Sequence, residues 1–226
     1  MSTARLSRQV VYGRNGMVCT NSPLSAAAGL KVLQEGGNAF DAALAVAATE
    51  TVTMVPMCGI GGDSFILLYE AANGQVTGMS SAGAPGSGTS ADYYRKQGLI
   101  KMPLEGPHSV GVPGEVAAWE EVHRRFCSKP FDQLLDTAVG YAEDGFALPP
   151  KIAQSFSSTH KRLAAFPSTA EVLLAGGRTP VEGDLLVNRD LAESLRRIGK
   201  GGAEEFYKGD LARKMIKALN NAGGLF

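Results

Sequence analysis

Cysteine, histidine, tryptophan and unbalanced charge are all scarce in this chain. It has three cysteines, three histidines and one tryptophan, and its 22 basic residues balance its 22 acidic ones. Cys19, Cys58 and Cys127 are too few for a disulfide framework and lack the paired spacing of a zinc site, so they are expected to be free thiols. A net charge of zero argues against nucleic acid or an acidic membrane as the main partner, because both select cationic surfaces.

Long apolar runs are also lacking. No stretch reaches the ~18 uninterrupted apolar residues of a membrane helix. Residues 1–16, MSTARLSRQVVYGRNG, contain no apolar core of a signal peptide. The sequence therefore predicts a soluble, cytoplasmic protein that binds neither nucleic acid nor a membrane.

Glycine, in contrast, is abundant, with 28 of 226 residues, and hydrophobic residues make up 44% of the chain. This composition is typical of a globular protein with a sizeable core, and the glycines indicate tight turns and close backbone approaches. The length fits one domain or slightly more.

Helix signals cover most of the chain. Ser22 and Pro23 begin a helix by the capping rules, and Gly36 with Gly37 ends it. A second helix, from 38 or 41 to 55, is apolar on nearly every face and therefore buried on more than one side. Further helices are expected over 114–126, 131–143, 150–165, 188–198 and 203–219.

A hairpin interrupts these helices. Residues 64–69 form a short apolar run typical of a buried strand, Asn73 and Gly74 are a strong hairpin signal, and 75–80 should return antiparallel. Residues 80–90 are a loop by composition. The predicted fold class is α/β in the broad sense, more closely α+β, with a helix layer on a sheet.

The glycine-rich segment from Gly59 to Ser64 superficially matches a phosphate-binding loop. A dinucleotide fingerprint needs a last glycine, follows a strand and opens a helix, whereas here Ser64 takes that position, a helix precedes and a strand follows. The simpler interpretation is a tight helix-to-strand turn, although such a backbone can also line an active site.

Spacing alone predicts no catalytic constellation. His108, His123 and His160 are scattered, Cys58 has no basic neighbour to lower its pKa, and the serines lack a nucleophile-elbow context. No metal ion or organic cofactor is implied.

Five motifs nevertheless occur in an order that resembles the N-terminal part of the gamma-glutamyltranspeptidase family. The resemblance runs from about Gly16 to Phe226 and is carried by these segments: GMVCTNSPLSAAAGLKVLQEGGNAFDAALAVAAT, GIGGDSFILLY, SVGVPGEVAAWEEVHRRF, AEDGFALPP and EGDLLVNRDLAESLRRIGKGGAEEFYKGDLARKMIKALNNAGG.

The resemblance implies an N-terminal nucleophile hydrolase with an αββα sandwich. Members of this family are made as a precursor that cleaves itself before a threonine, whose hydroxyl then attacks an amide while its freed α-amine serves as base. In the family this threonine belongs to the small subunit, beyond the position of Phe226. No catalytic residue is therefore assigned to this chain. Alone it should be inactive.

The partners implied are the missing C-terminal part, with its small subunit, and a small-molecule amide substrate. The family also admits a homodimer of such heterodimers. The chain stops at Phe226 with no closing strand, which is expected of a cut through a larger protein. The whole of 1–226 is then the N-terminal portion of the large subunit.

Two parts of the family's substrate site map onto this chain. By their match to the family's glycine motif, Gly59, Gly61, Gly62 and Asp63 are predicted to form a turn that borders the cleft. Ser81 stands where true gamma-glutamyl enzymes carry an arginine that holds the substrate's α-carboxylate. Losing a charge-assisted bond of ~1.5–3 kcal/mol weakens gamma-glutamyl binding by roughly ten- to a hundredfold.

This substitution favours the family's gamma-glutamyltransferase-like branch of acylases and amidohydrolases, which act on small amides such as oxamate, over enzymes that use glutathione. The sequence leaves one other class open, a non-catalytic truncated homologue or binding protein. A nucleotide-binding α/β domain is a weaker rival, for which added nucleotide would have to stabilise the fold.

Overall fold

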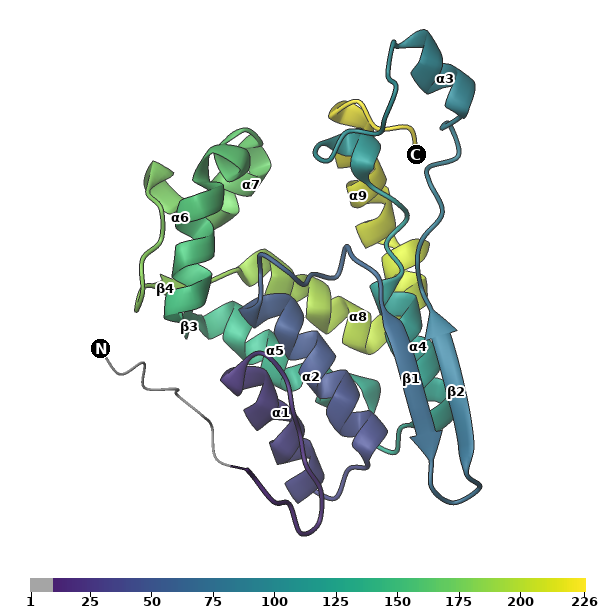
Figure 1. Ribbon diagram of the computed structural model, residues 1–226, viewed down its shortest axis with the longest axis vertical. Coiled ribbons are helices and arrows are strands. Elements are labelled where there is room, and N and C mark those ends of the chain that lie inside the picture. The colour runs from purple at the N-terminus through teal and green to yellow at the C-terminus, as the bar shows by residue number, and fades with distance from the viewer. Residues whose placement is uncertain (1–9) are drawn as a thin grey trace, which may run out of the picture.

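The computed structural model describes residues 10–226, so the first part of the segment used to predict localisation lies outside the described residues. Helices dominate it (Figure 1). Their bounds are α1 Pro23–Gln34, α2 Ala39–Thr53, α3 Ala91–Lys96, α4 Glu115–Phe126, α5 Phe131–Asp144, α6 Pro150–Ala164, α7 Pro167–Leu173, α8 Arg189–Tyr207 and α9 Asp210–Asn221, with short 3-10 turns at Pro107–Ser109 and Ala175–Gly177.

The first two helices begin at the residues that the capping rules predict. Ser22 caps α1, because its side chain accepts a hydrogen bond from Ser25 N. Asn38 caps α2 in a reciprocal capping box, in which Asp41 accepts from Asn38 N at 2.7 Å. The predicted end of α2 before Pro56 is confirmed, since the helix ends at Thr53.

The core lies where α2, α5 and α8 pack together, with α1 on the outer side of α2. Figure 1 shows α2 and α5 running through the middle of the molecule. Ala45 and Ala48 of α2 are fully buried, whereas Ala43 is exposed, so the burial predicted on nearly every face holds for part of the helix. Close approach of α5 to α2 follows from these small residues.

The predicted hairpin is confirmed as β1 (Phe65–Glu70) and β2 (Gln75–Ser80), paired antiparallel with Phe65 opposite Ser80. It lies beside α4 at one side of the molecule (Figure 1). Successive side chains of a strand point to opposite faces. Leu68 is buried on the inner face, whereas Phe65, Leu67 and Tyr69 of the outer face are 80%, 78% and 62% exposed. The prediction of a buried strand is therefore wrong for the outer face of β1 in this structure.

A second, minimal sheet pairs β3 (Phe146–Ala147) with β4 (Leu185–Leu186). The sequence analysis missed it, together with α3 and α7, because strands of two residues and helices of six or seven carry almost no periodic signal. Gly145 precedes β3 with φ of +86°, and a Cβ there would lie 2.7–3.0 Å from residues 185–187. Only glycine fits at position 145, where the chain passes close to residues 185–187.

The sequence predicts helices over 188–198 and 203–219, divided at the glycines near 200. This break is confirmed at Gly202, whose φ of +66° and ψ of −163° are not helical, although α8 resumes at Ala203 and continues to Tyr207. The single helix predicted over 203–219 is wrong, because the chain breaks again at Gly209 and α9 begins at Asp210. Glu120 accepts a hydrogen bond from Ala203 N at 2.7 Å, so a side chain from α4 stabilises the resumed turn after the kink.

None of the helices within 10–226 is long and apolar enough to cross a membrane.

Candidate functional site

The glycine-rich turn that the sequence singled out joins α2 to β1 and is attached to the start of α4. Gly62 O accepts hydrogen bonds from Gly114 N at 2.8 Å and Glu115 N at 3.0 Å. These are two of the N–H groups that a helix leaves without an internal partner at its first turn. The turn therefore replaces a side-chain cap on α4.

The glycines of this turn are exposed or half-buried, and none of Gly59, Gly61 and Gly62 has a positive φ. A Cβ at Gly59 or Gly61 would meet nothing within 4 Å. Asp63 is also exposed. Nothing within the described residues explains why 59 and 61 are glycine.

Ser81, the second predicted site residue, lies next to Ser64 at the open end of the hairpin. Its hydroxyl accepts a hydrogen bond from Ser64 N at 2.7 Å and donates to Ser64 O at 3.3 Å. The predicted site residues thus meet through Ser64, which the sequence analysis noted only as a serine without nucleophile context. Ser81 is held by the hairpin and by the glycine turn together.

Glu115, the first residue of α4, continues this network inward. Ser64 Oγ donates to Glu115 Oε2, and Trp119 Nε1 donates to Glu115 Oε1 at 2.6 Å. Glu115 is only 8% exposed, so these two donors supply the hydrogen bonds that water would otherwise make to its side-chain oxygens. The chain of contacts runs from Trp119 through Glu115 and Ser64 to Ser81.

Two further glycines permit the close approach of the Ser81 loop to α4. A Cβ on Gly114 would lie 1.6 Å from Ser81 O, and one on Gly83 would lie 1.6 Å from Val112 O. Both distances are far below any contact, so no other residue fits at either position. The Ser81 backbone is thereby pressed against the N-terminus of α4.

Tyr207, from the end of α8, secures the same helix start from the other side. Its hydroxyl donates to Pro113 O at 2.7 Å and accepts from Ala117 N at 3.1 Å. Burial raises the pKa of Tyr207, and nearby Glu115 and Glu120 add to this, so the phenol stays neutral and can donate. The sequence analysis missed Tyr207, Gly114 and Glu115 as site residues. The Pro-Gly-Glu step before an apolar helix was the one signal that pointed to the last two.

Cys58 directly precedes the glycine turn. Burial, with Glu50 and Glu115 nearby, raises the pKa of this half-buried thiol, which disfavours the reactive thiolate. The prediction of free thiols is confirmed, since Cys19, Cys58 and Cys127 are all unpaired in the structure. No group of side chains within 10–226 is arranged to hold a metal ion.

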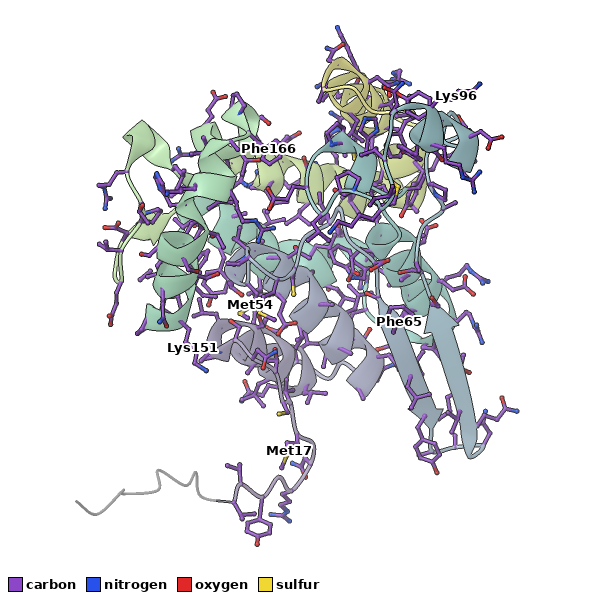
Figure 2. The ribbon with its side chains drawn as sticks, turned by 45° about the horizontal axis from the view of Figure 1, so that its top comes forward. Met17, Met54, Phe65, Lys96, Lys151 and Phe166 are labelled. Carbon is purple, nitrogen blue, oxygen red and sulfur yellow. The ribbon has the colours of Figure 1, made fainter. Side chains whose placement is uncertain are left out.

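A small cavity of about 240 Å³ adjoins the network between α2, β1 and α4. Glu115, Trp119 and Ser64 lie in its wall beside apolar residues such as Leu44 and Val122. Figure 2 labels Phe65, which follows Ser64 at the start of β1 and marks this end of the hairpin. The site is therefore a rigid wall of backbone turns and hydrogen-bonded side chains, without a complete set of reacting groups.

Known proteins resemble this chain in both sequence and structure. The family model described as gamma-glutamyltranspeptidase matches residues 25–226. The glutathione hydrolase-like YwrD proenzyme of Bacillus subtilis is 35% identical over 214 residues, which is 94% of this chain and 40% of that protein. The chain thus spans about two fifths of the length of this curated relative.

Solved structures agree with the sequence relatives. The cephalosporin acylase of Bacillus halodurans superposes with a TM-score of 0.92 at 33% identity, covering 97% of this chain and 42% of the acylase. The gamma-glutamyltranspeptidase of Helicobacter pylori gives a TM-score of 0.90 at 32% identity, covering 96% of this chain and 63% of that one. The predicted fold class, a helix-rich part of this hydrolase fold with an antiparallel hairpin, is confirmed.

Proposed function

Because the chain belongs to the gamma-glutamyltranspeptidase family, we propose that it is the N-terminal portion of the large subunit of a self-processing amide hydrolase or acyltransferase. Its relative in Bacillus subtilis is a proenzyme of which this chain matches 40%. The rest of such a precursor would supply the threonine nucleophile, its amine base and the amides that stabilise the oxyanion. This chain would supply one wall of the substrate site.

The outer face of the hairpin supports a partner of this kind. Phe65, Leu67 and Tyr69 form an exposed apolar row along β1, and Val76 opposite Tyr69 extends it. Burying a large apolar side chain is worth roughly 1.5–3 kcal/mol. The downstream part of the precursor would cover this row with further strands, as the second layer of a sandwich requires.

The substrate proposed is a small amide whose acyl group lacks a gamma-glutamyl headgroup. One observation carries this: Ser81 has its hydroxyl engaged by Ser64, and the loop 79–90 contains no arginine or lysine. A site without a cation there cannot form a bidentate contact with an α-carboxylate.

The test begins with the DNA downstream of the Phe226 codon. If the frame continues to a threonine-led segment, the whole precursor is expressed and its self-cleavage into two subunits is followed on a denaturing gel. The processed enzyme is then assayed with butyryl anilide and with gamma-glutamyl anilide, which differ in the α-amino and α-carboxylate groups. We expect self-cleavage, and a kcat/KM for butyryl anilide at least as large as for gamma-glutamyl anilide.

Two outcomes contradict the proposal separately. A stop codon after Phe226, with no second gene that supplies the threonine segment, removes the catalytic function and leaves a binding protein. A processed enzyme that prefers gamma-glutamyl anilide keeps the reaction but rejects the assigned substrate branch.

A further inference from the structure

A separate cavity of about 280 Å³ lies between α6, α7 and the segment that follows α2. Its lining is mostly apolar. Phe156, Leu163, Phe166 and Leu173 come from α6, α7 and the junction between them, and Val55 and Pro56 come from the segment after α2. Figure 2 labels Phe166 in one wall and Met54, which precedes Val55 in another. The volume is near the lower end of small-molecule sites, roughly 300–1,000 Å³, so its ligand is small.

One cation lies at the edge of this apolar space. Arg162, in the last turn of α6, lines the cavity together with Glu105, and its Nε contacts Glu105 Oε1 at 2.5 Å. The side chains are 62% and 41% exposed. An exposed pair of this kind is weak, because water and salt screen both charges. A competing carboxylate can therefore displace Glu105.

The contact with Glu105 engages Arg162 through Nε, and within 10–226 no hydrogen bond joins its two terminal nitrogens to another side chain. Those nitrogens are part of the planar fork that binds a carboxylate with two parallel hydrogen bonds. The hydroxyl hydrogen of the neighbouring Thr159 is already donated to Ser155 O at 2.7 Å. A bound carboxylate would therefore accept its hydrogen bonds from Arg162 rather than from Thr159.

We infer that this cavity binds a small organic carboxylate with an aromatic or branched apolar body. The body lies against Phe156 and Phe166, and the carboxylate takes the place of Glu105 on Arg162. Neither the glycine turn nor Ser81 lines this cavity. The inference does not rest on the proposed function, although a carboxylic acid is what hydrolysis of an amide releases.

The test is a calorimetric titration of the purified protein with phenylacetate, and with 4-methylpentanoate as a second carboxylate whose apolar body is branched. Phenylacetamide, which has the same shape without the charge, is the matched neutral probe. We expect saturable binding of one carboxylate per chain, and about tenfold weaker binding of phenylacetamide because the charge-assisted contact is lost.

Three variants separate the cavity from general anion binding. Arg162→Gln should weaken phenylacetate about tenfold, and Glu105→Gln should strengthen it severalfold by removing the competing carboxylate. Arg178→Gln is the matched control, because Arg178 is 63% exposed and paired with Asp184 at 2.7 Å but lies outside the cavity. It should leave the affinity unchanged.

The inference is overturned if neither carboxylate binds, or if Arg162→Gln binds phenylacetate as well as the unchanged protein does. Equal binding of phenylacetamide and phenylacetate also overturns it. Because Arg162 and Glu105 are both exposed, neither variant threatens folding, and the gain expected for Glu105→Gln cannot be produced by structural damage.

Discussion

Ser64 and Ser81 close the open end of the hairpin through both backbone and side chain. Ser81 N donates to Ser64 O at 3.0 Å, and Ser81 Oγ accepts from Ser64 N at 2.7 Å while donating to Ser64 O at 3.3 Å. The pair continues the ladder of β1 and β2 by one step and connects it to the glycine turn. Ser81, which the sequence predicts to contact substrate, therefore also stabilises the open end of the hairpin.

Ser81→Ala should lower the free energy of unfolding by about 1 kcal/mol, because Ser64 N loses its acceptor in a half-buried place. Urea denaturation measures this. Ser80→Ala, one position earlier on the exposed face of β2, is the control and should change stability by less than about 0.5 kcal/mol. Equal effects of the two substitutions would show that the Ser81 hydroxyl contributes nothing specific.

Gly114→Ala should destabilise the chain strongly, by more than about 3 kcal/mol, because its Cβ would lie 1.6 Å from Ser81 O and either the loop or α4 must move. Gly61→Ala is the control, since a Cβ there meets nothing within 4 Å. In this chain, Gly61→Ala should change the free energy of unfolding by no more than about 1 kcal/mol.

The same glycine tests whether the turn borders a cleft. In the complete precursor, Gly61→Val should impair self-cleavage or turnover, because the space beside Gly61 would then be occupied by substrate or by the downstream part. Normal processing and a normal rate would remove Gly61 from the proposed site.

Asp41 is fully buried at the start of α2, and its carboxylate accepts from Ser128 Oγ, Ser128 N and Lys129 N as well as from its own capping box. Burial acts to raise the pKa of Asp41, but these donors outweigh it and hold the pKa below its usual value. The stabilisation is therefore complete above the unfolded pKa of about 3.9 and is lost as the pH falls through the lower, folded pKa.

Asp41→Asn should cost about 1.5–3 kcal/mol at neutral pH, and the difference from the unchanged protein should shrink in acid. Urea denaturation at neutral pH and at a pH below the usual pKa of aspartate measures both. Asp136→Asn, on the exposed side of α5, is the control and should show neither effect. If Asp41→Asn lowered the free energy of unfolding equally at both pH values, the negative charge of Asp41 would not be what stabilises the fold.

Leu67 and Leu68 are neighbours on opposite faces of β1, 78% and 7% exposed. In the chain, Leu68→Ala should cost about 2 kcal/mol or more, whereas Leu67→Ala should cost less than about 0.5 kcal/mol. In the precursor the difference should shrink, with Leu67→Ala also destabilising because the downstream part covers it. Thermal melting of both forms provides the comparison, and an equally small effect of Leu67→Ala in the precursor would mean that the outer face stays uncovered.

The cysteines should differ in reactivity toward iodoacetamide. Burial raises the pKa of Cys127 to about 12, with Asp41 adding to the effect, so its thiolate is rare at neutral pH. Exposed Cys19 should be alkylated first, and Cys127 only on unfolding. Mass spectrometry of peptides after a timed reaction checks the order, and early modification of Cys127 would show that the α4–α5 turn opens readily.

Local signals sufficed for most elements because each is defined by neighbours in the chain. Ser22 with Pro23, and Pro56, locate helix ends whatever surrounds them, and Asn73 with Gly74 predicts the hairpin turn. The break predicted near 200 is confirmed as the kink at Gly202, where the backbone is not helical. The sequence did not show that Glu120 of α4 stabilises the turn after this kink, because α4 is distant in sequence.

For the candidate site, the order of motifs was enough to indicate the family and to select the glycine turn and Ser81. Spacing did not indicate that Ser81 bonds Ser64, that Glu115 accepts from Trp119, or that Tyr207 secures the start of α4. The contact of Tyr207 with Pro113 joins residues 94 positions apart, and it depends on how α4 and α8 are placed.

The sequence by itself determined the family, the helices of the core and the hairpin, because periodicity, caps and turn residues act over a few positions and motif order is read along the chain. Tertiary structure alone decided which glycines are obligatory. Gly61 has open space around it, whereas Gly114 is required by a carbonyl from a distant loop. It also decided the cavity at Arg162, because no local pattern shows that α6, α7 and the segment after α2 enclose one space.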